Sequence, residues 1–167
     1  YPHDDDESFQ VNPKTGEAFY GTTNITWWCM VPKETEEIKA PFDVLLYGHG
    51  YTSSRLEVLG FAGRTARHGA ATCALDAYGH GLALTNDDLD LPPAAALLGL
   101  KSTKMRDLIF EAGELLGFAG FARTLEMGRH RDLNNDGEPD SGGDFWTYDI
   151  FHTRDIVRQS IVDWLQF

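Results

Sequence analysis

The feature that most restricts the fold is an apolar strand, a glycine turn, a helix and a second apolar strand in direct succession. Pro41–Tyr47 is a nearly continuous apolar stretch that ends in a glycine turn, and Ala70–Asp76 is a second such stretch. Between them, Leu56–His68 places apolar residues at helical spacing and is followed by a glycine, which favours helix termination. Strands that are apolar throughout suit the interior of a parallel sheet, and strand–helix–strand units connect parallel strands. The pattern therefore predicts an α/β fold with a mainly parallel sheet and flanking helices.

The rest of the chain divides into segments around this unit. Residues 1–24 are acidic and then rich in turn residues, which predicts an irregular arm. Ile25–Val31 is β-branched and aromatic and predicts a further strand, so that 25–81 form the core. Residues 82–131 predict a helical insertion, which could be a lid or simple packing. It includes an amphipathic helix at Ser102–Glu114.

The C-terminal part begins with a polar loop at 132–144 and continues with a helical segment at 145–167. Its apolar residues recur at helical spacing over Thr153–Phe167, with Thr153 as the expected N-cap.

Composition excludes several classes of function. The net charge of −12 over 167 residues argues against nucleic-acid binding, which needs a basic face. No apolar run approaches the roughly 20 residues that span a bilayer. The chain begins at Tyr1 without a targeting segment, which suggests a processed, secreted protein, extracellular, on the cell surface or periplasmic. Cys29 and Cys73 fit either one disulfide in an oxidising compartment or two buried thiols.

The acidic loop at 132–140 predicts a calcium site. Oxygen-bearing side chains occupy positions 1, 3, 5 and 9, a glycine occupies position 6, and position 7 offers its backbone carbonyl. Position 12 is Gly143 rather than glutamate, and the next residue could supply the missing carboxylate. Hard oxygen ligands favour calcium over zinc. The expected ligands are Asp132, Asn134, Asp136, Glu138, Asp140 and Asp144, in a structural role. A solvated acidic turn without an ion is the alternative.

The segments VLLYGHGYTSSR and TCALDAYGHG resemble the third and fourth strands of the α/β-hydrolase family, of the kind found in secreted bacterial esterases and lipases. The resemblance covers 25–81 well and 145–167 loosely. It implies that the backbone N–H of Tyr51 is an oxyanion donor and that His80 is a structural turn histidine. It also implies that the second strand runs antiparallel beside the fourth, which would place Cys29 and Cys73 on adjacent strands and favours a disulfide.

The chain departs from this family because it contains no G-x-S-x-G nucleophile motif. In the family that motif would follow the helix within 145–167, so residues 1–167 resemble the N-terminal half, and we expect this chain alone to be inactive. Ser141 lies in a D-S-G-G segment similar to that of trypsin-like proteases, but in a metal-type loop it is not expected to be a nucleophile.

The expected function is therefore the N-terminal portion of a secreted serine hydrolase acting on a small ester or lipid. Its partner would be a C-terminal half, or another chain, that covers the open sheet edge and supplies serine, acid and histidine. The alternative is a non-catalytic, calcium-stabilised surface or assembly module built on the same half-fold.

Overall fold

The computed structural model describes residues 9–82, 99–133, 136, 137, 139, 141–147 and 149–167. They form two compact units, residues 1–81 with 129–167 and residues 82–128. The first is a mixed α/β unit and the second is a helical pair. Among the described residues, no helix is both long and apolar enough to cross a membrane.

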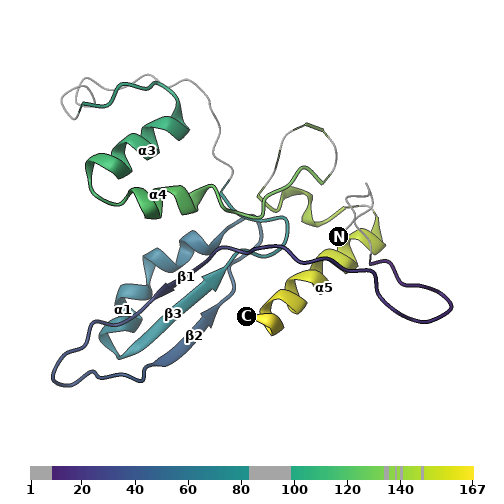
Figure 1. The fold of residues 1–167 in the computed structure, drawn as a ribbon, viewed down its shortest axis with the longest axis horizontal. Coiled ribbons are helices and arrows are strands. Elements are labelled where there is room, and N and C mark those ends of the chain that lie inside the picture. Colours follow the sequence, from purple (N-terminus) through teal and green to yellow (C-terminus); the bar gives the residue numbers. More distant parts are fainter. Residues whose placement is uncertain (1–8, 83–98, 134–135, 138, 140, 148) are drawn as a thin grey trace. The chain divides into compact units, whose positions relative to one another are not determined.

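The first unit is built on a three-stranded sheet in the order β1-β3-β2 (Figure 1). The central strand β3 (Ala70–Leu75) pairs antiparallel with β1 (Trp27–Met30) and parallel with β2 (Asp43–Tyr47). The described sheet is therefore mixed, with one parallel pair, so the predicted α/β class is confirmed whereas the described sheet is not mainly parallel. The three strands fall where the apolar runs predicted them, because such runs gain most from burial in a sheet.

Cys29 and Cys73 occupy directly opposite positions of β1 and β3 and form a disulfide. This settles the two interpretations of the cysteines in favour of the bonded pair. The bond joins the two strands across 44 residues of sequence, so it restrains the part of the chain that contains β2 and its following turn.

The connection from β2 to β3 differs from the single predicted helix. Arg55–Gly60 form the 3₁₀ helix η1, capped by the hydroxyl of Ser54, and α1 follows at Ala62–Arg67. Glycines at 60 and 63 weaken a continuous α-helix here. Gly69, with φ of +83°, then reverses the chain into β3.

The helix α5 (Ile150–Gln166) begins one turn before the predicted start. Its N-cap is Asp149, whose carboxylate accepts the N–H groups of the first turn, whereas the Thr153 hydroxyl pairs with Thr147. The helix contributes Ile156 to a buried cluster with Tyr78, Leu133 and Phe145. The Ser160 hydroxyl also accepts the Tyr78 N–H, so α5 is fastened to the exit of β3.

The second unit contains α3 (Met105–Leu115) and α4 (Ala119–Leu125), which form a close pair. A methyl group added to Gly113 would lie 2.7 Å from the Cβ of Ala122, so the helices approach too closely for a side chain at this position. Arg106 and Glu126 form an ion pair at the surface. The described part of the 82–131 insertion is thus helical, as predicted. Whether it acts as a lid stays a prediction.

Candidate functional site

The candidate site is the turn that leaves β2 at its carboxyl end. Gly50–Ser53 is closed by the Ser53 N–H donating to the Gly50 carbonyl at 3.2 Å. Thr52 has φ of +60°, a region that a β-branched residue rarely adopts. Within the described part of the chain, the Tyr51 N–H has no hydrogen-bond acceptor. The turn therefore presents a free backbone donor at the end of a parallel strand.

The His49 side chain holds this turn through hydrogen bonds at both nitrogens of its ring. Its side chain is 2% exposed, and its Nε2 accepts the Ala77 N–H at 2.9 Å. Because Nε2 accepts, the proton lies on Nδ1, which donates to the Gly50 carbonyl at 2.8 Å. His49 thus links the turn after β2 to the turn after β3.

Glu57 holds the Gly50 end of the turn. Its carboxylate accepts the Tyr47 hydroxyl at 2.5 Å and the Gly50 N–H at 3.4 Å. The hydrogen bond from Ser53, followed by that from Tyr47, lowers the pKa of Glu57, while the same bond to Glu57 raises the pKa of Tyr47. Glu57 is therefore an ionised acceptor in this arrangement.

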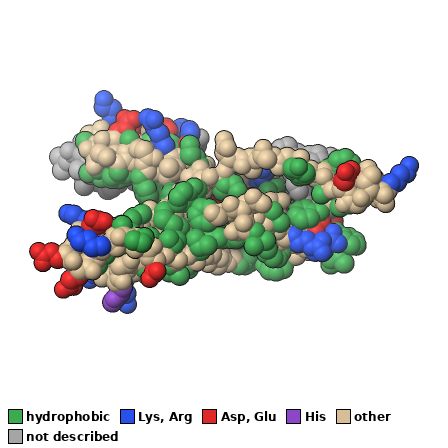
Figure 2. Space-filling view, turned by 60° about the horizontal axis from the view of Figure 1, so that its bottom comes forward, with side chains coloured by type: hydrophobic (Ala, Val, Ile, Leu, Met, Phe, Trp, Pro, Cys, Tyr) green, Lys and Arg blue, Asp and Glu red, His purple; other side chains and the backbone are tan. Residues whose placement is uncertain are grey.

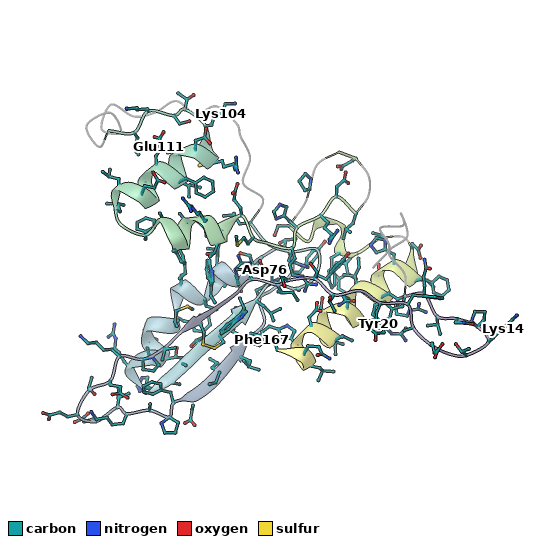
Figure 3. All side chains as sticks on the ribbon, viewed as in Figure 1. Lys14, Tyr20, Asp76, Lys104, Glu111 and Phe167 are labelled. Atoms are coloured by element: carbon teal, nitrogen blue, oxygen red, sulfur yellow. A yellow bond between two sulfur atoms is a disulfide. The ribbon has the colours of Figure 1, made fainter. Side chains whose placement is uncertain are left out.

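A buried ion pair lies directly behind the turn. Asp76, at the end of β3, is fully buried and accepts the backbone N–H of Arg55 at 2.6 Å. Its second oxygen pairs with the Arg55 guanidinium, which is also buried and packs over Trp28 at 4.9 Å. Burial lowers the pKa of Arg55 and the charge of Asp76 opposes that shift. Figure 3 shows Asp76 where the strand ends and the following loops converge.

His80 fills the space between these turns. The ring is 2% exposed, its Nδ1 lies 3.1 Å from the Tyr78 carbonyl, and its centroid is 4.9 Å from that of His49 and 5.0 Å from that of Phe145. Burial is the largest effect and lowers the pKa of His80, so the ring is neutral at neutral pH. His80 is thus a buried, hydrogen-bonded residue of the turn after β3.

The segment after the acidic loop packs onto both turns. The Ser141 hydroxyl donates to the Ser53 carbonyl and accepts the Gly81 N–H, both at 3.2 Å. The Gly142 N–H donates to Gly79, and the Tyr51 hydroxyl donates to the Gly143 carbonyl at 3.1 Å. Sequence reasoning treated Ser141 only as a rejected nucleophile and missed this connecting role.

The Tyr51 ring lies in an aromatic group at the surface. Its centroid is 6.3 Å from Trp146 and 6.4 Å from Phe145, and Tyr51 and Trp146 are 52% and 59% exposed. Exposed aromatic rings next to a free backbone donor form a surface on which an apolar group can pack.

The structure describes only part of the predicted calcium loop. The Asp132 carboxylate accepts the N–H groups of Asp136 and Gly137, at 3.0 and 2.8 Å. Gly137 has φ of +94°, as a sharp turn at position 6 requires. Asn134, Glu138 and Asp140 lie outside the described residues, as does the side chain of Asp144. In the described part, no group of three metal-binding side chains occurs, so calcium binding stays a prediction.

A complete catalytic set is not present in what the structure describes. Among those residues, no serine hydroxyl is hydrogen-bonded to a histidine ring. The site is thus a turn whose Tyr51 amide has no acceptor among the described residues, with the ionised Glu57 at its Gly50 end and the Asp76–Arg55 ion pair behind it. No protein-family model, curated protein or solved structure matches the chain.

Proposed function

We propose that residues 1–167 form the N-terminal part of a secreted serine ester hydrolase of the α/β-hydrolase type. The observation that carries the proposal is the free Tyr51 N–H at the carboxyl end of β2. A fixed backbone donor at that place suits the negative oxygen that develops during acyl transfer.

The Tyr51 N–H is available for this role because it has no hydrogen-bond acceptor among the described residues. The charge of the nearby Asp76 is balanced by Arg55. The ionised carboxylate of Glu57, which accepts the Gly50 N–H, acts against a negative oxygen at the turn, so the Tyr51 donor has to outweigh this repulsion.

The strand order also supports the proposal. In the α/β-hydrolase family, the second strand lies antiparallel beside the fourth, and the third and fourth strands are joined by a helix. The sheet has β1 antiparallel beside β3, and η1 and α1 between β2 and β3. This order leaves β2 at an edge, where a further parallel strand carrying the nucleophile could pair.

The exposure of β2 favours such a further segment. Val44, Leu45 and Leu46 are 59%, 42% and 51% exposed, although they form a sheet strand. Figure 2 shows hydrophobic side chains gathered on a face of the molecule. An uncovered apolar edge strand invites aggregation. In the proposal, a C-terminal segment or partner chain covers this edge and supplies serine, acid and histidine in that order.

The test is covalent labelling of the complete protein with a fluorophosphonate, which reacts with activated serines. We expect labelling outside residues 1–167. Tyr51→Pro should then lower kcat for a p-nitrophenyl ester about 100-fold or more, because it removes one oxyanion donor. Proline is common at the second position of a turn. Tyr51→Phe keeps the N–H and should lose far less. Absence of labelling, or labelling within this chain, would contradict the proposal.

A second function is favoured by the same exposed apolar residues. A surface or assembly module could use β2 and α5 as an interface, stabilised by calcium and without catalysis. In that case the complete protein would form a stable complex and would not react with the fluorophosphonate.

A further inference from the structure

The positive φ of Thr52 indicates that the turn Gly50–Ser53 is held in its conformation by contacts with other segments. The left-handed backbone of Thr52 is strained for a β-branched residue and persists only where neighbouring structure imposes it. At the Gly50 end, that support comes from Glu57 and His49, both near in sequence. At the Ser53 end, it comes from a segment 88 residues further along the chain.

We propose that Ser141 is a positioning residue that sets the orientation of the Tyr51 amide through the Ser53 carbonyl. The inference rests on the proposed function. Its hydroxyl is bonded on both sides, donating to Ser53 and accepting from Gly81, so it ties the turn after β2 to the turn after β3.

A second hydrogen bond to segment 141–143 also holds Tyr51 in place. The Tyr51 hydroxyl donates to the Gly143 carbonyl, so the residue that carries the free amide is also held by its side chain. The Gly142 N–H donates to Gly79 at 2.8 Å and fixes the segment itself against the second turn. Segment 141–143 therefore braces the turn at its carbonyl end and at its ring.

Loss of the Ser141 bond would loosen the turn. Thr52 could then leave the left-handed region, and the Ser53 N–H could separate from the Gly50 carbonyl, which belongs to the same peptide unit as the Tyr51 N–H. That peptide unit would lose one of the two hydrogen bonds that orient it, the other being the bond from His49 Nδ1.

The experiment measures amide hydrogen exchange at Ser53 by NMR in the wild type and in Ser141→Ala. Exchange should become about fivefold faster, the factor that corresponds to the loss of one hydrogen bond worth about 1 kcal/mol. The matched control is Ser160→Ala, whose hydroxyl also accepts one backbone N–H and donates to one carbonyl in the same unit. The control should leave Ser53 exchange unchanged.

Two further variants keep the test decisive. Tyr51→Phe removes the bond to Gly143 at an exposed position, so it should fold even if Ser141→Ala does not, and it should also speed exchange at Ser53. Thr52→Asn relieves the strain, because asparagine tolerates the left-handed region, and should reduce the effect of Ser141→Ala. Equal exchange in the Ser141 and Ser160 variants, or no rescue by Thr52→Asn, would overturn the proposal.

The same variants in the complete protein separate this inference from the proposed function. Ser141→Ala should slow fluorophosphonate labelling severalfold and lower kcat with KM unchanged, whereas Ser160→Ala should not. If exchange at Ser53 responds as described but the wild type is never labelled, the positioning role of Ser141 for the turn stands and the hydrolase proposal fails.

Discussion

Gly142 is the position where the packing of the site can be measured most directly. Its φ is +74°, and an added Cβ would lie 2.8 Å from Cε1 of the His80 ring and closer still to Nε2. Gly142→Ala therefore introduces two separate costs, a strained backbone and a collision with a buried ring that is itself bonded to Tyr78.

The two costs can be estimated and separated. The left-handed backbone costs an alanine about 1–2 kcal/mol. Overpacking a buried site costs a further 1–3 kcal/mol or so. Gly142→Ala should thus lower the free energy of unfolding by about 2–5 kcal/mol. Gly16→Ala is the matched control, because Gly16 has φ of +73° and nothing within 4 Å of an added Cβ, so it carries the backbone cost alone.

Urea unfolding followed by tryptophan fluorescence measures both variants. A double-mutant cycle with His80→Ala then tests the collision, because Gly142→Ala should cost less once the ring is removed. Equal destabilisation by the two glycine variants, or no coupling between positions 142 and 80, would show that the segment after the acidic loop does not pack on His80.

Three other predictions follow from the same unit. Replacing Cys29 and Cys73 by alanine should cost about 4 kcal/mol in urea unfolding, because the bond closes a loop of 44 residues; thiols that alkylate in the denatured protein without reductant would contradict the bond. Burial lowers the pKa of His80 below its unfolded value near 6.5, so the unfolded state binds the proton more readily. The resulting stability is present above pH 6.5 and is lost as the pH falls below it. His80→Gln should therefore reduce the fall in Tm between pH 7 and 5. An identical fall in the wild type and the variant would refute this. If the acidic loop binds calcium, EDTA should lower the Tm, and excess calcium at 100 times its Kd should restore about 2.7 kcal/mol; the same Tm with and without EDTA, or an equal response of Asp132→Ala, would argue for a solvated turn.

Local patterns in the sequence predicted where the strands lie, because a short apolar run indicates a buried strand whichever strands it pairs with. The strands at 27–30, 43–47 and 70–75 lie within apolar runs that predicted them. The helix start was wrong by a turn, because both Asp149 and Thr153 are suitable caps and only the fold decides which hydroxyl or carboxylate faces the free N–H groups.

The bonds that brace the site were not predictable in this way. Arg55 is buried although arginine is mostly exposed, and the only sequence clue is an acidic residue 21 positions away. Ser141 meets Ser53 across 88 residues, a contact that no periodicity encodes. The Tyr51 amide was predicted from the resemblance, but its bracing by Ser141 and Glu57 emerges only from the tertiary structure.

The exposure of β2 distinguishes the two proposed functions on geometric grounds. Successive residues of a strand face opposite sides of the sheet, so Val44 and Leu46 lie on one face and Leu45 on the other. All three are exposed, so both faces of this strand are uncovered at once. A module that docks against one face would leave the other apolar face in water. Covering both faces requires a layer of structure on each side of the strand. The hydrolase proposal, in which the sheet continues past β2 with flanking helices, supplies a layer on each side, and for this reason we favour it over the assembly module.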